Sequence, residues 1–106
     1  MIVRVVRLSL NRKDLAAFDA LFHRHHADIE SQFGCRGVEL LTDPTDPSIR
    51  GTLSRWESED ALNAYRRSEL FGVVWPATKA LFSAPPEVWS YEVAERGQGL
   101  SLAFDS

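Results

Sequence analysis

The sequence has one cysteine, no long apolar run and no excess of basic residues. Cys35 has no partner for an intramolecular disulfide, which fits a reducing cytoplasm, and a lone cysteine is more often a small buried apolar residue than a nucleophile. No stretch approaches the ~20 apolar residues that a membrane-spanning helix needs. The net charge of −3 argues against nucleic acid, because phosphate binding needs a clustered basic surface. We therefore expect a cytoplasmic protein that binds neither membranes nor nucleic acids.

Recognisable cofactor motifs are missing as well. The sequence contains no G-x-G-x-x-G element of the kind that opens a dinucleotide-binding fold. The segment HRHH (23–26) places His23 and His26 three positions apart on a helix, but no third metal ligand is in view, and zinc sites use three or four protein ligands. We predict no metal and no cofactor.

What the sequence does contain is the pattern of one small domain with strands and helices. Short β-branched or alternating segments predict four strands, at residues 2–8, 38–43, 48–56 and 88–93. The two Asp-Pro pairs of DPTDP (43–47) predict a turn that makes the second and third strands a hairpin. Gly51, in the middle of the third strand, indicates either a bulge or a close approach by another group.

Two helical regions separate these strands. Asn11 is expected to cap the first helix, with Asp14 three positions later. The apolar stripe of this helix is formed by Leu15, Phe18, Phe22 and Ile29. Ser58 caps the second region, Ser68 bends or restarts it, and Pro76 breaks or kinks it again.

The resulting order of strand, helix, strand, strand, helix, strand predicts an α+β, ferredoxin-like βαββαβ fold with an antiparallel four-stranded sheet. Both helices then cover the same face of the sheet. On the other face, apolar side chains would then be exposed to water. They are alternate members of the set Val3/Val5, Ile2/Val6/Leu8, Leu40/Leu41 and Leu53. Because an apolar patch of that size normally marks an interface, we expect a homodimer packed sheet to sheet. The domain covers residues 1–94, and the tail 95–106 is either flexible or packs on the partner subunit.

Three segments carry a family resemblance. RWESEDALNAYRRSELF (55–71), ALFSAPPEVWSYEV (80–93) and FGCRGVELLTDPTDP (33–47) resemble the antibiotic biosynthesis monooxygenase family. The resemblance covers residues 1 to about 94 and implies a dimeric α+β barrel with a pocket in each subunit, between the helices and the sheet. Several members are cofactor-independent monooxygenases that oxidise quinols or polycyclic phenols with molecular oxygen. The superfamily is chemically diverse, so the resemblance alone does not assign the reaction.

A haem-degrading branch of this superfamily makes a specific demand on the sequence. Its motif has an Asn on the first strand, a Trp in the following helix and a His ligand on the later helix. The matching positions here are Val6, Tyr65 and Trp75. Because Trp has no lone pair to offer iron, haem degradation is disfavoured.

Aromatic side chains are the main candidates for a binding site. Phe71, Trp75 and Phe82 recur at helical spacing, Trp56 and Tyr65 precede them, and Phe22 lies on the first helix. Such a stripe is usually core; the resemblance implies that Phe22, Trp56, Phe71 and Trp75 line a substrate pocket. Tyr65 would hydrogen-bond a phenolic oxygen, with a core tyrosine as the alternative.

The expected base is His25. It lies within about 40° of the centre of the apolar stripe of its helix, at 100° per residue. A histidine on such a face is more often a satisfied core residue, but its ordinary pKa suits proton abstraction at neutral pH. Among the strand arginines, one of Arg4, Arg7, Arg50 and Arg55 could turn inward to stabilise a phenolate or carboxylate, although solvation is the commoner role.

The leading prediction is a cofactor-independent monooxygenase of a quinol or polycyclic phenol, acting on a small aromatic substrate and molecular oxygen. Deprotonation yields an electron-rich anion that donates an electron to oxygen directly. Two alternatives stay open: a dimer that binds or senses a small aromatic without turnover, and an isomerase that uses His25 without oxygen.

Overall fold

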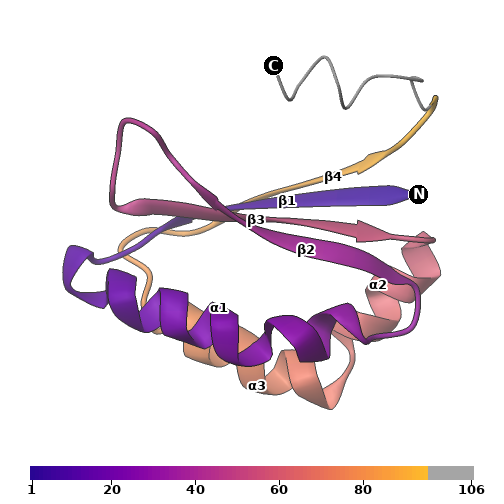
Figure 1. Ribbon diagram of the computed structural model, residues 1–106, viewed down its shortest axis with the longest axis horizontal. Coiled ribbons are helices and arrows are strands. Elements are labelled where there is room, and N and C mark those ends of the chain that lie inside the picture. Colours follow the sequence, from indigo (N-terminus) through magenta and orange to yellow (C-terminus); the bar gives the residue numbers. More distant parts are fainter. Residues whose placement is uncertain (96–106) are drawn as a thin grey trace.

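A computed structural model describes residues 1–95. Four strands form one antiparallel sheet in the order β2-β3-β1-β4 (Figure 1). Their bounds are β1 (Ile2–Ser9), β2 (Cys35–Thr42), β3 (Ile49–Trp56) and β4 (Glu87–Glu92). With helices between the first and second strands and between the third and fourth, this is the predicted ferredoxin-like α+β fold. The predicted tail lies almost wholly outside the described residues.

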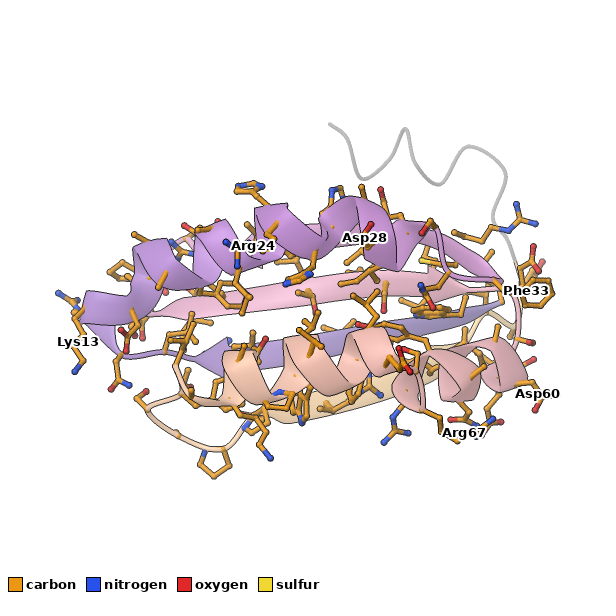
Figure 2. All side chains as sticks on the ribbon, turned by 90° about the horizontal axis from the view of Figure 1, so that it is seen from below. Lys13, Arg24, Asp28, Phe33, Asp60 and Arg67 are labelled. Atoms are coloured by element: carbon orange, nitrogen blue, oxygen red, sulfur yellow. The ribbon has the colours of Figure 1, made fainter. Side chains whose placement is uncertain are left out.

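The helices lie together on one face of the sheet (Figure 1). They are α1 (Leu15–Glu30), α2 (Glu59–Arg66) and α3 (Glu69–Lys79), with a 3-10 helix, η1 (Arg12–Asp14), before α1. Charged residues such as Arg24 and Asp28 are exposed on the side of α1 away from the sheet, as seen from below in Figure 2. No helix among the described residues is long and apolar enough to cross a membrane.

Two serines divide the second helical region, as predicted. The Ser58 hydroxyl accepts a hydrogen bond from the Ala61 N–H (3.1 Å) and caps α2. The Ser68 hydroxyl accepts from the Phe71 N–H (3.2 Å) and caps α3. Each cap satisfies an N–H group that has no partner within its own helix.

The expected break at Pro76 is not found. Helix α3 continues through Pro76 to Lys79, and the Ala80 N–H donates to the Pro76 carbonyl oxygen (3.2 Å). Pro76 lacks an N–H, so the helix gives up only the bond to the carbonyl of Gly72.

The predicted cap at Asn11 is also wrong. Asn11 makes no side-chain cap bond; its amide nitrogen donates instead to the carbonyl oxygens of Leu81 and Phe82 (3.3 Å each). The side chain thus ties the start of the first helical region to the segment after α3. Asp14 precedes α1 without a side-chain cap bond as well.

Gly51 is needed for a close approach and not for a bulge. The register is regular at Gly51, and the irregularity of the hairpin lies between Cys35 and Gly37. A side chain at Gly51 would place Cβ 3.1 Å from the Val6 carbonyl oxygen and 3.4 Å from the Leu41 Cβ. The second strand also begins three residues earlier than predicted, because the chain pairs through this irregularity.

The pleat of the sheet divides the strand residues into two faces. Even-numbered residues of β1 and β3, together with Val38 of β2, face the helices. We call this the inner face. Its buried core consists of two clusters, one with Val6, Leu8, Leu10 and Phe18, and one with Trp56, Ala61 and Leu62. We call the opposite side, which the described helices leave uncovered, the outer face (Figure 1).

Candidate functional site

A cavity of about 100 Å³ lies between the inner face and helices α1 and α3. Side chains fill much of the space between these helices (Figure 2). The lining is mostly apolar: Val6, Leu8, Phe18, Leu21, Phe22, Ile29, Val38, Trp56, Phe71, Val74 and Trp75. Five side chains with polar atoms join it: Arg4, Thr52, Ser54, Tyr65 and Thr78. A mostly apolar enclosure with a few polar groups is typical of small-molecule sites.

The predicted aromatic residues come together in one continuous row of rings. Trp56 stacks on Tyr65 with centroids 5.0 Å apart, and Tyr65 meets Phe71 edge-on at 5.2 Å. Phe71 in turn stacks on Trp75 at 5.8 Å. These are favourable aromatic geometries, and together with Phe22 from α1 all the predicted substrate-binding residues line the cavity.

Trp56 is the most buried ring of this wall. It ends β3 on the inner face and is only 1% exposed. Its indole N–H donates to the Ser54 hydroxyl oxygen (3.0 Å), so the buried donor is satisfied. Trp56 therefore serves as core and as cavity wall at the same time.

Tyr65 brings a hydroxyl group into the apolar cavity from α2. Burial raises the pKa of Tyr65 to about 12, a rise that nearby Cys35 reinforces and Arg4 opposes. The hydroxyl therefore stays protonated at neutral pH and can donate a hydrogen bond. Among the described residues, none hydrogen-bonds this hydroxyl.

Arg4 is the strand arginine that turns into the cavity. It lies on β1 directly opposite Ser54 of β3 and Ser90 of β4, two uncharged residues. Burial lowers the pKa of Arg4, the nearby Arg66 lowers it further, and Tyr65 raises it. Within residues 1–95, no carboxylate forms an ion pair with Arg4.

The other strand arginines have carboxylate partners. Arg50 makes a two-point contact with Asp19 of α1 (3.0 and 3.3 Å). Arg7 pairs with Asp43 (3.5 Å), and Arg55 pairs with Glu39 (2.5 Å). Each of these three charges is therefore paired, whereas that of Arg4 has no such partner in the part of the chain that the structure describes.

The predicted base, His25, is half-buried on α1 but is not among the residues that line the cavity. Its neighbours on the apolar stripe, Phe22 and Ile29, do line it. The adjacent His26 has a structural position: its ring stacks on Phe22 (centroids 5.0 Å apart), and Nε2 lies 2.8 Å from the Val38 carbonyl oxygen. Because a carbonyl oxygen can only accept, Nε2 of His26 carries the proton.

Glu30 completes this contact between α1 and β2. Its carboxylate accepts from the Val38 N–H (3.0 Å) and lies 3.3 Å from His26 Nε2. The pair positions Val38, which lines the cavity, so His26 supports the site without entering it. Among the described residues, no three side chains of His, Cys, Asp or Glu gather as a metal site would require.

The sequence of this chain matches one family model. The sequence model of the family described as antibiotic biosynthesis monooxygenase matches residues 1–74, more than half of the chain. The chain belongs to the antibiotic biosynthesis monooxygenase family. No curated protein matches the sequence.

Several solved structures share the fold at low sequence identity. SnoaB from Streptomyces nogalater, described as a cofactor-independent oxygenase, is 20% identical with a TM-score of 0.80, over 90% of this chain and 94% of that one. Rv0793 from Mycobacterium tuberculosis is 18% identical, TM-score 0.81, over 92% and 98% of the two chains. A Deinococcus radiodurans protein named for the same family is 17% identical, TM-score 0.84, over 92% and 97%. At these identities the likeness concerns the fold.

Sequence reasoning identified the aromatic wall but left Arg4 unresolved among the strand arginines. A signal was available, because Arg4 shares its strand parity with Val6 and Leu8, both buried on the inner face. Val74 and Thr78 of α3 were missed; they follow the stripe through Phe71 and Trp75 at helical spacing.

Proposed function

We propose that this protein is a cofactor-independent monooxygenase that oxidises a small phenol or quinol with molecular oxygen. The observation that carries the proposal is the aromatic-walled cavity with a protonated Tyr65 hydroxyl that no described residue hydrogen-bonds, in a chain of the monooxygenase family. A phenolic oxygen in the cavity could accept a hydrogen bond from this hydroxyl. The description of SnoaB as a cofactor-independent oxygenase supports the same chemistry.

The size of the cavity favours a single aromatic ring. Its volume of about 100 Å³ is below the roughly 300–1,000 Å³ of typical drug-sized ligand sites and nearer to the roughly 150 Å³ that holds benzene. The flat faces of Trp56 and Phe71 suit a planar guest. We therefore place single-ring phenols and quinols ahead of polycyclic phenols as substrates.

In the proposed reaction the bound phenol first loses its proton, and the Tyr65 hydroxyl stabilises the phenolate oxygen. The phenolate transfers one electron to oxygen, and the resulting phenoxyl and superoxide radicals combine to form a carbon–oxygen bond. The peroxide anion then takes up a proton, which replaces the one lost by the phenol, and becomes a hydroperoxide. Loss of water from that hydroperoxide gives the quinone, so one oxygen atom enters the product and the other leaves as water. The apolar wall excludes solvent from the radical pair.

The proton of the bound phenol has to pass to a group outside the cavity lining. The lining residues include no His, Asp or Glu, so the phenol loses its proton either to solvent or to His25 after a side-chain movement. The same observation favours a second candidate function, in which the protein binds a small aromatic without converting it.

Oxygen uptake by metal-stripped protein tests the proposal. Phenol, hydroquinone and a polycyclic phenol are offered in turn, with Tyr65→Phe as the variant and Tyr91→Phe, whose ring is 60% exposed, as the matched control. We expect uptake with stoichiometric quinone for a single-ring substrate, reduced about ten- to a hundredfold in Tyr65→Phe only, the loss of one hydrogen bond to developing charge. Binding without uptake above autoxidation would favour the second candidate.

A further inference from the structure

Arg4 stands out because its charge has no ion-pair partner among residues 1–95. Arg7, Arg50 and Arg55 each pair with a carboxylate, whereas Arg4 lines the cavity between two serines. Glu92 of β4 lies diagonally across from Arg4 but forms no ion pair with it in residues 1–95. A half-buried guanidinium without a counter-charge loses hydration and gains little in return.

The charged and polar groups around Arg4 also favour the binding of an anion. Burial lowers the pKa of Arg4 most, and Arg66, a second cation, lowers it further. Tyr65, the other titratable residue of the lining, is neutral at pH 7 because its pKa is raised to about 12. The described groups that act on the pKa of Arg4 are therefore a second cation and a neutral hydroxyl, and the diagonal Glu92 forms no ion pair with it.

We propose that Arg4 binds a carboxylate on the ligand, and that the ligand is a single-ring aromatic acid. A phenol is neutral at pH 7, so it does not balance the guanidinium before reaction, whereas a carboxylate is ionised. The planar guanidinium also matches a carboxylate with two parallel hydrogen bonds. This inference rests on the proposed function for its site, since both place the ligand in the same cavity, but it requires no turnover.

Arg4 and Tyr65 contact different groups of the ligand, as their chemistry requires. Arg4 is charged at all working pH values and holds the carboxylate in the ground state. Tyr65 donates to the phenolic oxygen, where negative charge develops. An acid with a ring hydroxyl, such as a hydroxybenzoate, satisfies both groups at once.

Calorimetric binding to the full chain tests the inference with matched probes. The acid 4-hydroxybenzoate is compared with the neutral 4-hydroxybenzamide, which has nearly the same shape. We expect the acid to bind about ten- to a hundredfold more tightly, the range of hydrogen bonds to a charged group. In Arg4→Met this preference should disappear while the affinity for the amide persists, which also shows that the variant folds. Arg4→Lys should retain part of the preference.

Arg55→Met is the matched control, because Arg55 lies on the outer face and pairs with Glu39. It should keep the wild-type preference. Equal affinities for acid and amide, no binding of the acid, or a preference that survives in Arg4→Met would each overturn the inference. The oxygenase proposal fails separately. Binding of the acid without oxygen uptake would contradict the oxygenase reaction and leave the role of Arg4 intact. Oxygen uptake with neutral phenols alone would contradict the role of Arg4 and leave the reaction intact.

Discussion

The inner and outer faces of the sheet are built from alternate residues of the same strands, yet they end in different environments. On the inner face, Val6 and Trp56 are buried beneath the helices and enclose a cavity. On the outer face, Trp89 and Tyr91 of β4 are 39% and 60% exposed. Val5 pairs directly with Leu53 and with Trp89 there, so the exposed rings continue an apolar row across three strands.

This difference shows how much of the sheet a short chain can cover by itself. Three helices provide enough apolar surface to cover one face of a four-stranded sheet, and the described residues provide no second layer (Figure 1). The outer face is therefore where a second copy of the chain would pack, as the predicted homodimer requires. The following predictions test this contrast, from the largest expected effect to the smallest.

Replacing one tryptophan on each face by alanine should have different effects on the free energy of unfolding. We expect Trp56→Ala to lower the free energy of unfolding by about 3–5 kcal/mol, because it removes a buried ring and leaves a cavity. This loss should not depend on protein concentration. Trp89→Ala should cost less, and its cost should grow with protein concentration if the outer face is a dimer interface. Urea unfolding at two concentrations measures both; similar, concentration-independent losses would contradict the contrast.

A charge on the outer face should block association without unfolding the chain. We expect Trp89→Glu to weaken a dimer by at least about 2 kcal/mol, the scale of an interface hot spot, because the carboxylate would be buried against an apolar surface. Sedimentation equilibrium measures the change. Phe33→Glu is the control, since Phe33 is 86% exposed and lies in the turn between α1 and β2, at the end of the sheet (Figure 2). A monomeric wild-type protein, or a dimer sensitive only to Phe33→Glu, would refute the predicted interface.

Alkaline pH should affect the inner face selectively through Tyr65. The folded-state pKa of about 12 lies above the ordinary value near 10, so the folded protein holds this proton more tightly than the unfolded chain. The stabilisation is complete below pH ~10 and is lost as the pH rises toward 12. Thermal melts between pH 8 and 11.5 should show a weaker decline for Tyr65→Phe than for wild type. Identical declines would argue against a buried hydroxyl.

His25→Ala should have the smallest effect on catalysis. A general base typically contributes about 10²–10⁴-fold, but the His25 ring lies outside the cavity lining, so we expect kcat/KM to change by less than about threefold. Steady-state oxygen uptake measures it. A hundredfold loss with unchanged stability would instead support His25 as the base and would require its side chain to move inward.

Much of this architecture could be predicted from local sequence. The caps at Ser58 and Ser68 were recognised because a hydroxyl before an acidic first turn satisfies helix N–H groups locally. The aromatic wall was expected from the family resemblance alone, since the helical spacing of the rings by itself predicts core. Asn11 was misassigned because its partners, Leu81 and Phe82, are some seventy positions away, beyond the reach of any local pattern.

The sequence by itself determined the order of strands and helices, since periodicity, caps and turns act over a few residues. Only the tertiary structure decided which side chains meet. It distinguished Arg4 from Arg50, because pairing requires Asp19 of another element to lie opposite, and it left His25 outside a cavity that Phe22 enters. The physical reason is that burial and unbalanced charge depend on neighbours brought together by folding, and those neighbours are distant in the chain.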